Sequence, residues 1–136
     1  MRRANRVSMA IVFILVISIC SPVIAKEDGK FNSSNGCSCH TSNTPATTPN
    51  HNFPSTYTPN QSYSISIGFS GGVTGSDGGF SLEVSQGTLS TGMSIGSVKI
   101  NSAGNQATHT NPDYRSWGLY WEAPSSGSGN IIFELA

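Results

Sequence analysis

The sequence of 136 residues carries 7 Lys+Arg against 7 Asp+Glu, and only 10% of its residues are charged. This length accommodates one modest domain and excludes a large multidomain enzyme. Arg2, Arg3 and Arg6 lie at the N-terminus, so the remainder of the chain is mildly acidic. It therefore offers no basic field to a phosphate backbone, and nucleic acid is not expected as a partner.

Residues 1–25 have the pattern of a cleaved secretory signal peptide. The three arginines precede an apolar run from Met9 to Ile19, and Val23-Ile24-Ala25 supplies the small-residue pattern that signal peptidase recognises. Polar residues end the apolar run well short of the roughly 20 residues that span a bilayer. We expect export, cleavage after Ala25 and a mature chain without a membrane span, either secreted or held at the cell surface.

Residues 26–58 show no sustained apolar period and are rich in Asn, Ser, Thr and Pro, which predicts an irregular arm around a Cys-Ser-Cys-His cluster. The pattern changes at Tyr63, where large apolar residues up to Phe69 alternate with serine and glycine, as in a half-buried strand. The same reasoning predicts further strands at Phe80–Val84, Met93–Ile100, Gln106–Thr110, Ser116–Trp121 and Asn130–Leu135.

Short alternating strands separated by Gly, Pro and Asn turns predict an all-β fold, an antiparallel sandwich over residues 59–136. Because the sequence is apolar up to its last residue, Ala136, we expect the domain to lack its final C-terminal segment. The predicted core comprises Tyr63, Ile65, Ile67, Phe80, Leu82, Val84, Trp117, Leu119 and Trp121.

The Cys-Ser-Cys-His cluster is the one concentration of reactive side chains in the mature chain. Cys37 and Cys39 are one residue apart, and His40 follows directly. In an exported protein the pair is expected to form a disulfide or to have a simple structural role. Thiolate and imidazole also suit copper or zinc, so a bare metal site with His51 or His109 as a further ligand is a weaker alternative.

Other candidate sites are better explained by structure. Trp117, Tyr120 and Trp121 suggest a platform for sugar rings, but alternation places both tryptophans on the core face and leaves Tyr120 as the surface candidate. The many serines show no Ser/His/acid order typical of a hydrolase. The sequence therefore does not indicate an enzyme.

Several motifs occur in the order found in a known family. They are Tyr57-Thr58-Pro59-Asn60-Gln61-Ser62-Tyr63-Ser64-Ile65, Gly79-Phe80-Ser81-Leu82-Glu83-Val84, Thr108-His109-Thr110 and Trp121-Glu122-Ala123-Pro124 with the following Gly127–Phe133. This order resembles the Reeler-type domain, and more closely its prokaryotic branch, choice-of-anchor V. The resemblance implies an immunoglobulin-like sandwich on an exported or surface-attached protein with no established catalytic activity.

The resemblance also implies an alternative for the cysteine cluster. Members of the prokaryotic branch often carry Cys-x-x-Cys-His near this point, the spacing of a covalent c-type haem site. Here one intervening residue is missing, so Cys39 would form one thioether beside the proximal ligand His40, and Cys37 would be badly placed for the second. His109 would be the sixth ligand if the arm folds back over the sheet, with His51 as the alternative.

Two functions follow as hypotheses. The first is a non-enzymatic secreted or cell-surface Reeler-like module for binding, adhesion or display, with an unidentified extracellular partner. The second is a monohaem electron-transfer protein that uses Cys37, Cys39, His40 and His109.

Overall fold

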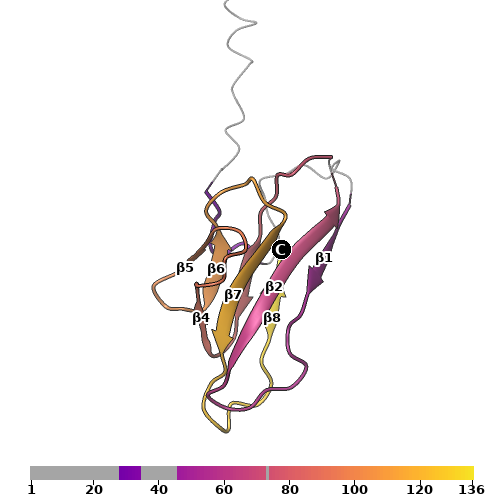
Figure 1. Ribbon diagram of the computed structural model, residues 1–136. Coiled ribbons are helices and arrows are strands. Elements are labelled where there is room, and N and C mark those ends of the chain that lie inside the picture. The colour runs from indigo at the N-terminus through magenta and orange to yellow at the C-terminus, as the bar shows by residue number, and fades with distance from the viewer. Residues whose placement is uncertain (1–27, 35–45, 73) are drawn as a thin grey trace, which may run out of the picture.

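The computed structural model describes residues 28–34, 46–72 and 74–136. These residues form eight strands and no helix, and the strands make two antiparallel sheets packed face to face (Figure 1). The predicted all-β sandwich is confirmed. The first sheet, in spatial order, contains β1 (Thr47–His51), β2 (Ser62–Gly71), β7 (Ser116–Glu122) and β4 (Thr88–Ser90). The second contains β5 (Val98–Ile100), β6 (Gln106–His109), β3 (Ser81–Val84) and β8 (Phe133–Leu135).

The core lies between the sheets and consists largely of the residues that the alternating pattern predicts. Across β2 and β7, Ile67 is in register with Trp117 and Ile65 with Leu119, so all four side chains point to the same face. None of the four is more than 1% exposed. Burying a side chain of this size contributes about 1.5–3 kcal/mol, so these four residues are a large source of hydrophobic stabilisation. The predicted core residue Tyr63 is only partly buried, because it lies at the start of β2 against Trp121.

Two strands, β1 and β4, were not predicted. Strand β1 occupies Thr47–His51, inside the segment expected to be irregular, and all five of its residues are exposed. It joins the sheet through main-chain pairing with β2 and contributes no apolar alternation that a sequence pattern could reveal. Strand β4 has three residues, of which only Leu89 is buried. The sandwich therefore begins before residue 59, and the predicted strands Met93–Ile100 and Asn130–Leu135 shorten to β5 and β8.

Strand β1 forms the outer edge of its sheet, with Pro49 at its midpoint. Pro49 is in register with Phe69 of β2, and the Phe69 N–H donates to the Arg115 carbonyl on the opposite side of β2. Between β1 and β2, the Asn52 N–H donates to the Ser66 carbonyl, so this pair is a hydrogen-bonded one. Hydrogen-bonded and non-hydrogen-bonded pairs alternate along an antiparallel ladder. Pro49 and Phe69 are consequently a pair without mutual hydrogen bonds, and the imide nitrogen of Pro49 faces the open edge.

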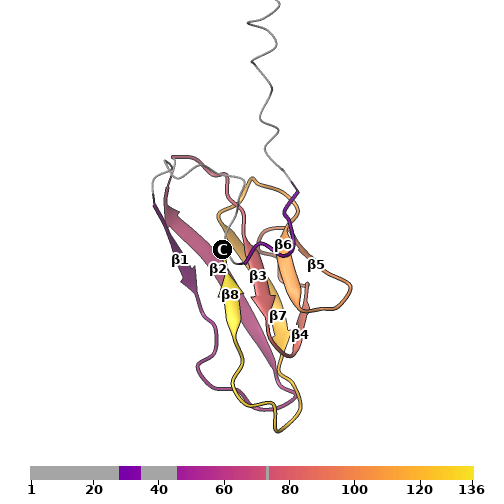
Figure 2. The ribbon, with the colours of Figure 1, turned by 180° about the vertical axis from the view of Figure 1, so that it is seen from behind.

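An N-terminal segment, residues 28–34, lies on the outer face of the second sheet, beside β6 and β3 (Figure 2). Register places Gln106 and Thr108 on this face, opposite Glu83 and Ser81, while Leu82 and Ala107 enter the core. Outward polar residues are normally solvated, yet Gln106 is 6% exposed and Thr108 is fully buried. The segment therefore covers this sheet as a third layer.

Polar contacts attach the segment to all four strands of the second sheet. Asp28 forms an ion pair with Lys99 of β5, and the Gln106 amide of β6 donates to Asn32 Oδ1 at 2.6 Å. The Ser34 hydroxyl lies 3.3 Å from a Glu83 carboxylate oxygen on β3 and 3.4 Å from one of Glu134 on β8.

Candidate functional site

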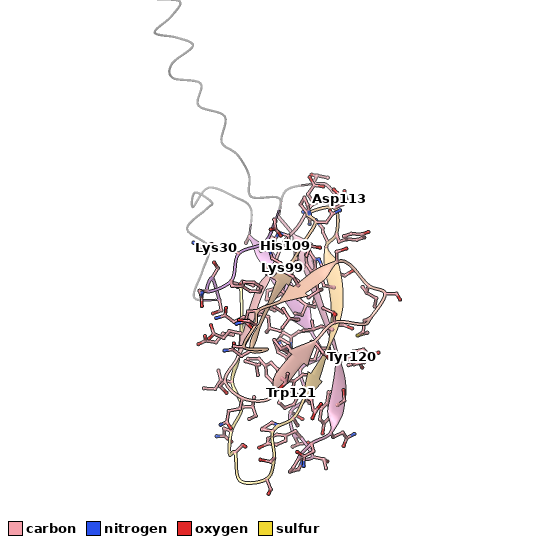
Figure 3. All side chains as sticks on the ribbon, turned by 90° about the vertical axis from the view of Figure 1, so that its left-hand side faces the viewer. Lys30, Lys99, His109, Asp113, Tyr120 and Trp121 are labelled. Atoms are coloured by element: carbon pink, nitrogen blue, oxygen red, sulfur yellow. The ribbon has the colours of Figure 1, made fainter. Side chains whose placement is uncertain are left out.

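His109 ends β6 at the upper end of the sandwich in Figure 3, where its imidazole is half-buried between the sheets. The Phe80 N–H donates to His109 Nδ1 at 3.2 Å, and the two ring centroids are 6.4 Å apart. The ring also lies beside Trp117, with centroids 6.2 Å apart. The Nδ1 atom is thus already engaged by the main chain, and any external ligand would have to approach Nε2.

Burial lowers the pKa of His109 below the ordinary value of 6.5, because a charged imidazolium would lose hydration there. The Phe80 carbonyl oxygen, 3.4 Å from Nδ1, acts in the opposite direction because it would accept a hydrogen bond from the charged ring, and the nearby Lys99 cation adds to the lowering. Asp28, paired with Lys99, partly compensates by favouring the charged form. The neutral imidazole, with Nδ1 accepting from Phe80, is the form that this environment favours.

Of the predicted partners of His109, only His51 lies among the described residues, and it is not beside His109. Cys37, Cys39 and His40 lie outside the described residues, so the disulfide, haem and metal hypotheses stay predictions. His51 lies on edge strand β1, where its exposed ring stacks on Phe53 with centroids 4.2 Å apart. Residues 28–34, 46–72 and 74–136 contain no group of three or more His, Cys, Asp or Glu side chains that would hold a metal ion.

The loop after β1 and the loop before β8 lie at the other end of the sandwich (Figure 1). Residues of both loops line a pocket there. It has a volume of about 350 Å³ and is open to solvent. This volume is at the lower end of the range for small-molecule sites. Its lining residues are Pro54, Ser55, Thr56, Tyr57, Trp121, Gly129, Asn130, Ile131 and Phe133.

Aromatic packing fixes the floor and walls of this pocket. Trp121 of β7 is fully buried and forms the floor, so it supports the walls rather than offering a surface of its own. Phe133 meets Trp121 edge-on at a centroid distance of 5.1 Å and stacks on Phe53 at 4.6 Å. Tyr57 packs edge-on against Trp121 at 5.9 Å. These contacts orient the exposed parts of Tyr57 and Phe133, which are the ring surfaces a ligand would meet.

Hydrogen bonds hold the two loops in place around the aromatic walls. The Tyr57 hydroxyl donates to the Gly129 carbonyl at 3.0 Å and so links one loop to the other. Ser85, which follows β3, donates its N–H to the Ile132 carbonyl and accepts the Ile132 N–H on its hydroxyl, both at 2.9 Å. The Gln86 amide donates to the Ser128 carbonyl at 3.0 Å. The pocket is therefore preformed.

Polar groups surround the pocket mouth. Ser55, Thr56 and Asn130 are exposed, and their side chains make no hydrogen bond to any other residue of the described ranges. None of the nine lining residues carries a charge at neutral pH. The arrangement offers neutral donors and acceptors around an apolar interior, a chemistry suited to binding and not to acid–base or nucleophilic catalysis.

Sequence reasoning did not identify this pocket, because its two loops are more than seventy residues apart in the chain. The available signal was the pair Phe53 and Tyr57, two aromatic residues within an otherwise polar segment. The alternative sugar platform is not supported: Trp117 and Trp121 are fully buried, as the alternation predicts, and Tyr120 is 37% exposed on the other face of the sheet.

Solved structures share this fold. The Reelin-N domain of F-spondin is 19% identical to this chain with a TM-score of 0.52, over 65% of this chain and 69% of that one. The reeler domain of human F-spondin is 18% identical with a TM-score of 0.51, over 85% of this chain and 84% of that one. No protein-family profile matches the chain, and no curated protein matches it. The fold is thus that of Reeler domains, as the sequence motifs predict, while the choice-of-anchor V assignment stays a prediction.

Among the described residues, no helix is long and apolar enough to cross a bilayer.

Proposed function

We propose that this chain is an exported, non-catalytic Reeler-like module that binds an extracellular ligand through the pocket between the Pro54–Tyr57 loop and the Gly129–Phe133 segment. The observation that carries the proposal is the preformed pocket itself. Its aromatic walls and polar mouth are fixed by the Tyr57–Gly129 hydrogen bond and by packing on Trp121.

The position of the pocket supports this function. The ends of a β-sandwich carry the loops that vary without disturbing the core, and binding residues in such folds concentrate there. Preformed loops also lower the entropic cost of binding, because few side chains must be ordered when the ligand arrives. The predicted signal peptide, residues 1–25, would place the module outside the cytoplasm, and the choice-of-anchor V resemblance would place it at the cell surface.

The experiment measures binding of the exported protein, fluorescently labelled, to intact cells and to isolated extracellular polymer of the source organism. We expect saturable binding that unlabelled protein competes away. Tyr57→Ala should weaken it, whereas Tyr114→Ala should not, because Tyr114 is 43% exposed and lies outside the pocket lining. Circular dichroism confirms that both variants fold. Binding that does not saturate, or that both variants retain in full, would contradict the proposal.

A further inference from the structure

We infer that the pocket accepts the ring of a neutral sugar, as a free saccharide or as one residue of a neutral glycan. This inference rests on the proposed function and names its ligand class.

The lining disfavours a charged ligand. Pro54, Ile131 and Phe133 are apolar, and the remaining side chains are neutral hydroxyl, amide, phenol and indole groups. A carboxylate, sulfate or ammonium entering this space would lose hydration without gaining an opposite charge, and that loss is costly. The ligand that fits the pocket is therefore uncharged.

The distribution of groups favours a polyhydroxylated ring over a purely apolar ligand. A pyranose has an apolar face of C–H groups and a perimeter of hydroxyls. Tyr57 and Phe133 line the pocket with half-buried rings; one face of Phe133 is stacked on Phe53, and the remaining exposed parts of the two rings offer apolar surface to such a face. Ser55, Thr56 and Asn130 stand at the mouth with uncommitted side-chain donors and acceptors, where the hydroxyl perimeter would lie. A wholly apolar ligand would strip water from these groups without replacing their hydrogen bonds.

Size and openness restrict the ligand to a short one inside the pocket. A volume of about 350 Å³ holds a single ring, and the opening to solvent lets a longer glycan continue outward. A proline-rich peptide is the main competing occupant, because aromatic grooves also bind extended proline segments. The sugar is favoured because three uncommitted polar side chains of the mouth would match ring hydroxyls, whereas a proline segment offers only carbonyl acceptors.

The test is a titration of the exported protein, labelled with ¹⁵N, followed through its amide resonances. The probes are glucose, galactose, mannose and N-acetylglucosamine with their disaccharides, and the comparison ligands are galacturonic acid, glucosamine and a decaproline peptide. At least one neutral sugar should produce saturable shifts confined to residues 54–57 and 129–133. Tyr57→Ala should abolish them, and Asn130→Ala should weaken affinity about 5-fold, as expected for one neutral hydrogen bond. Asn50→Ala, on the outer face of β1, is the matched control and should bind like the native chain.

Several outcomes would overturn the inference: shifts from decaproline or a charged sugar and none from neutral sugars, shifts centred away from the two loops, or undiminished sugar binding by both pocket variants. If no sugar binds while the labelled protein still binds cells in a Tyr57-dependent way, the sugar assignment fails and the proposed function stands. If neither binding is observed, both fail.

Discussion

The Gly29 N–H donates a hydrogen bond to the His109 carbonyl oxygen at 3.0 Å, joining the N-terminal segment to the end of β6. Gly29 is buried in this contact, and a Cβ atom there would overlap the Thr108 hydroxyl and approach the His109 carbonyl oxygen to 2.6 Å. The segment can therefore lie this close to the sheet only because residue 29 has no side chain.

Replacing Gly29 with alanine should displace the segment from the sheet and lower the free energy of unfolding by about 1–3 kcal/mol, the usual cost of overpacking. Urea unfolding measures the stability, and hydrogen exchange at Gln106 and Thr108 reports the loss of cover. Gly68→Ala is the control, because its Cβ would make only ordinary contacts, the nearest at 3.5 Å from the Arg115 carbonyl oxygen. Equal stability and exchange in the two variants would show that the segment does not depend on this contact.

His109 should make stability dependent on pH. Because burial lowers its pKa below 6.5, the folded chain binds fewer protons than the unfolded chain just below that value. The stabilisation is present while His109 is neutral and is lost as the pH falls through 6.5 toward the lowered folded pKa. His109→Asn keeps an acceptor for the Phe80 N–H and removes the titration, so it should flatten this dependence. The measurement is urea unfolding at about pH 7.5 and about pH 5.5. An unchanged difference in the variant would assign the dependence to other groups.

The two core tryptophans should respond differently to replacement by phenylalanine. Trp121 Nε1 donates to the Gln86 carbonyl at 3.0 Å, whereas the buried Nε1 of Trp117 has no hydrogen-bond partner among the described residues. Both substitutions remove the same atoms from the core. Only Trp121→Phe also breaks a hydrogen bond, while Trp117→Phe removes an unsatisfied donor, so Trp121→Phe should destabilise by about 1–3 kcal/mol more. Equal losses in chemical denaturation would indicate that Trp117 Nε1 is satisfied in solution.

Loss of the Tyr57 hydroxyl should loosen the pocket without unfolding the sandwich. Tyr57→Phe removes the bond to the Gly129 carbonyl and keeps the ring on Trp121, at an expected cost of about 0.5–1.5 kcal/mol. Amide exchange should quicken at residues 129–131, and ligand affinity should fall while the ring contact survives. Tyr114→Phe serves as the control. If exchange in the loop is as slow in Tyr57→Phe as in the native chain, other contacts suffice to hold it.

The cysteine cluster is tested by mass and visible spectrum of protein exported from a host with haem-attachment machinery. We expect a mass two hydrogens below that of the reduced chain, as for a Cys37–Cys39 disulfide, and no Soret band. A mass increase of one haem with Soret absorbance would contradict this and establish the electron-transfer alternative. In that case His40→Ala should abolish the band, and His109 would serve as ligand only through Nε2, because Nδ1 accepts from Phe80.

The sequence predicts those parts of the fold in which side chains alternate between core and solvent. Ile65 and Ile67 on β2, and Trp117, Leu119 and Trp121 on β7, follow this alternation, and all are buried as predicted. Strand β1 pairs with β2 through its main chain and buries none of its residues, so no apolar pattern reveals it. Residues 28–34 cover β6 through polar pairs such as Asn32 with Gln106. The two residues of such a pair are distant in the sequence and come together only in the folded chain. The pocket likewise arises where distant loops meet.

Pro49, at the midpoint of β1, hinders the addition of another strand to this edge of the first sheet. Its nitrogen faces outward and carries no hydrogen, so a strand approaching this edge would find no donor at the centre of the five residues available for pairing. Chains that meet at high local concentration are consequently hindered from extending one another's sheets along β1, and fibre growth through this edge is disfavoured at its middle.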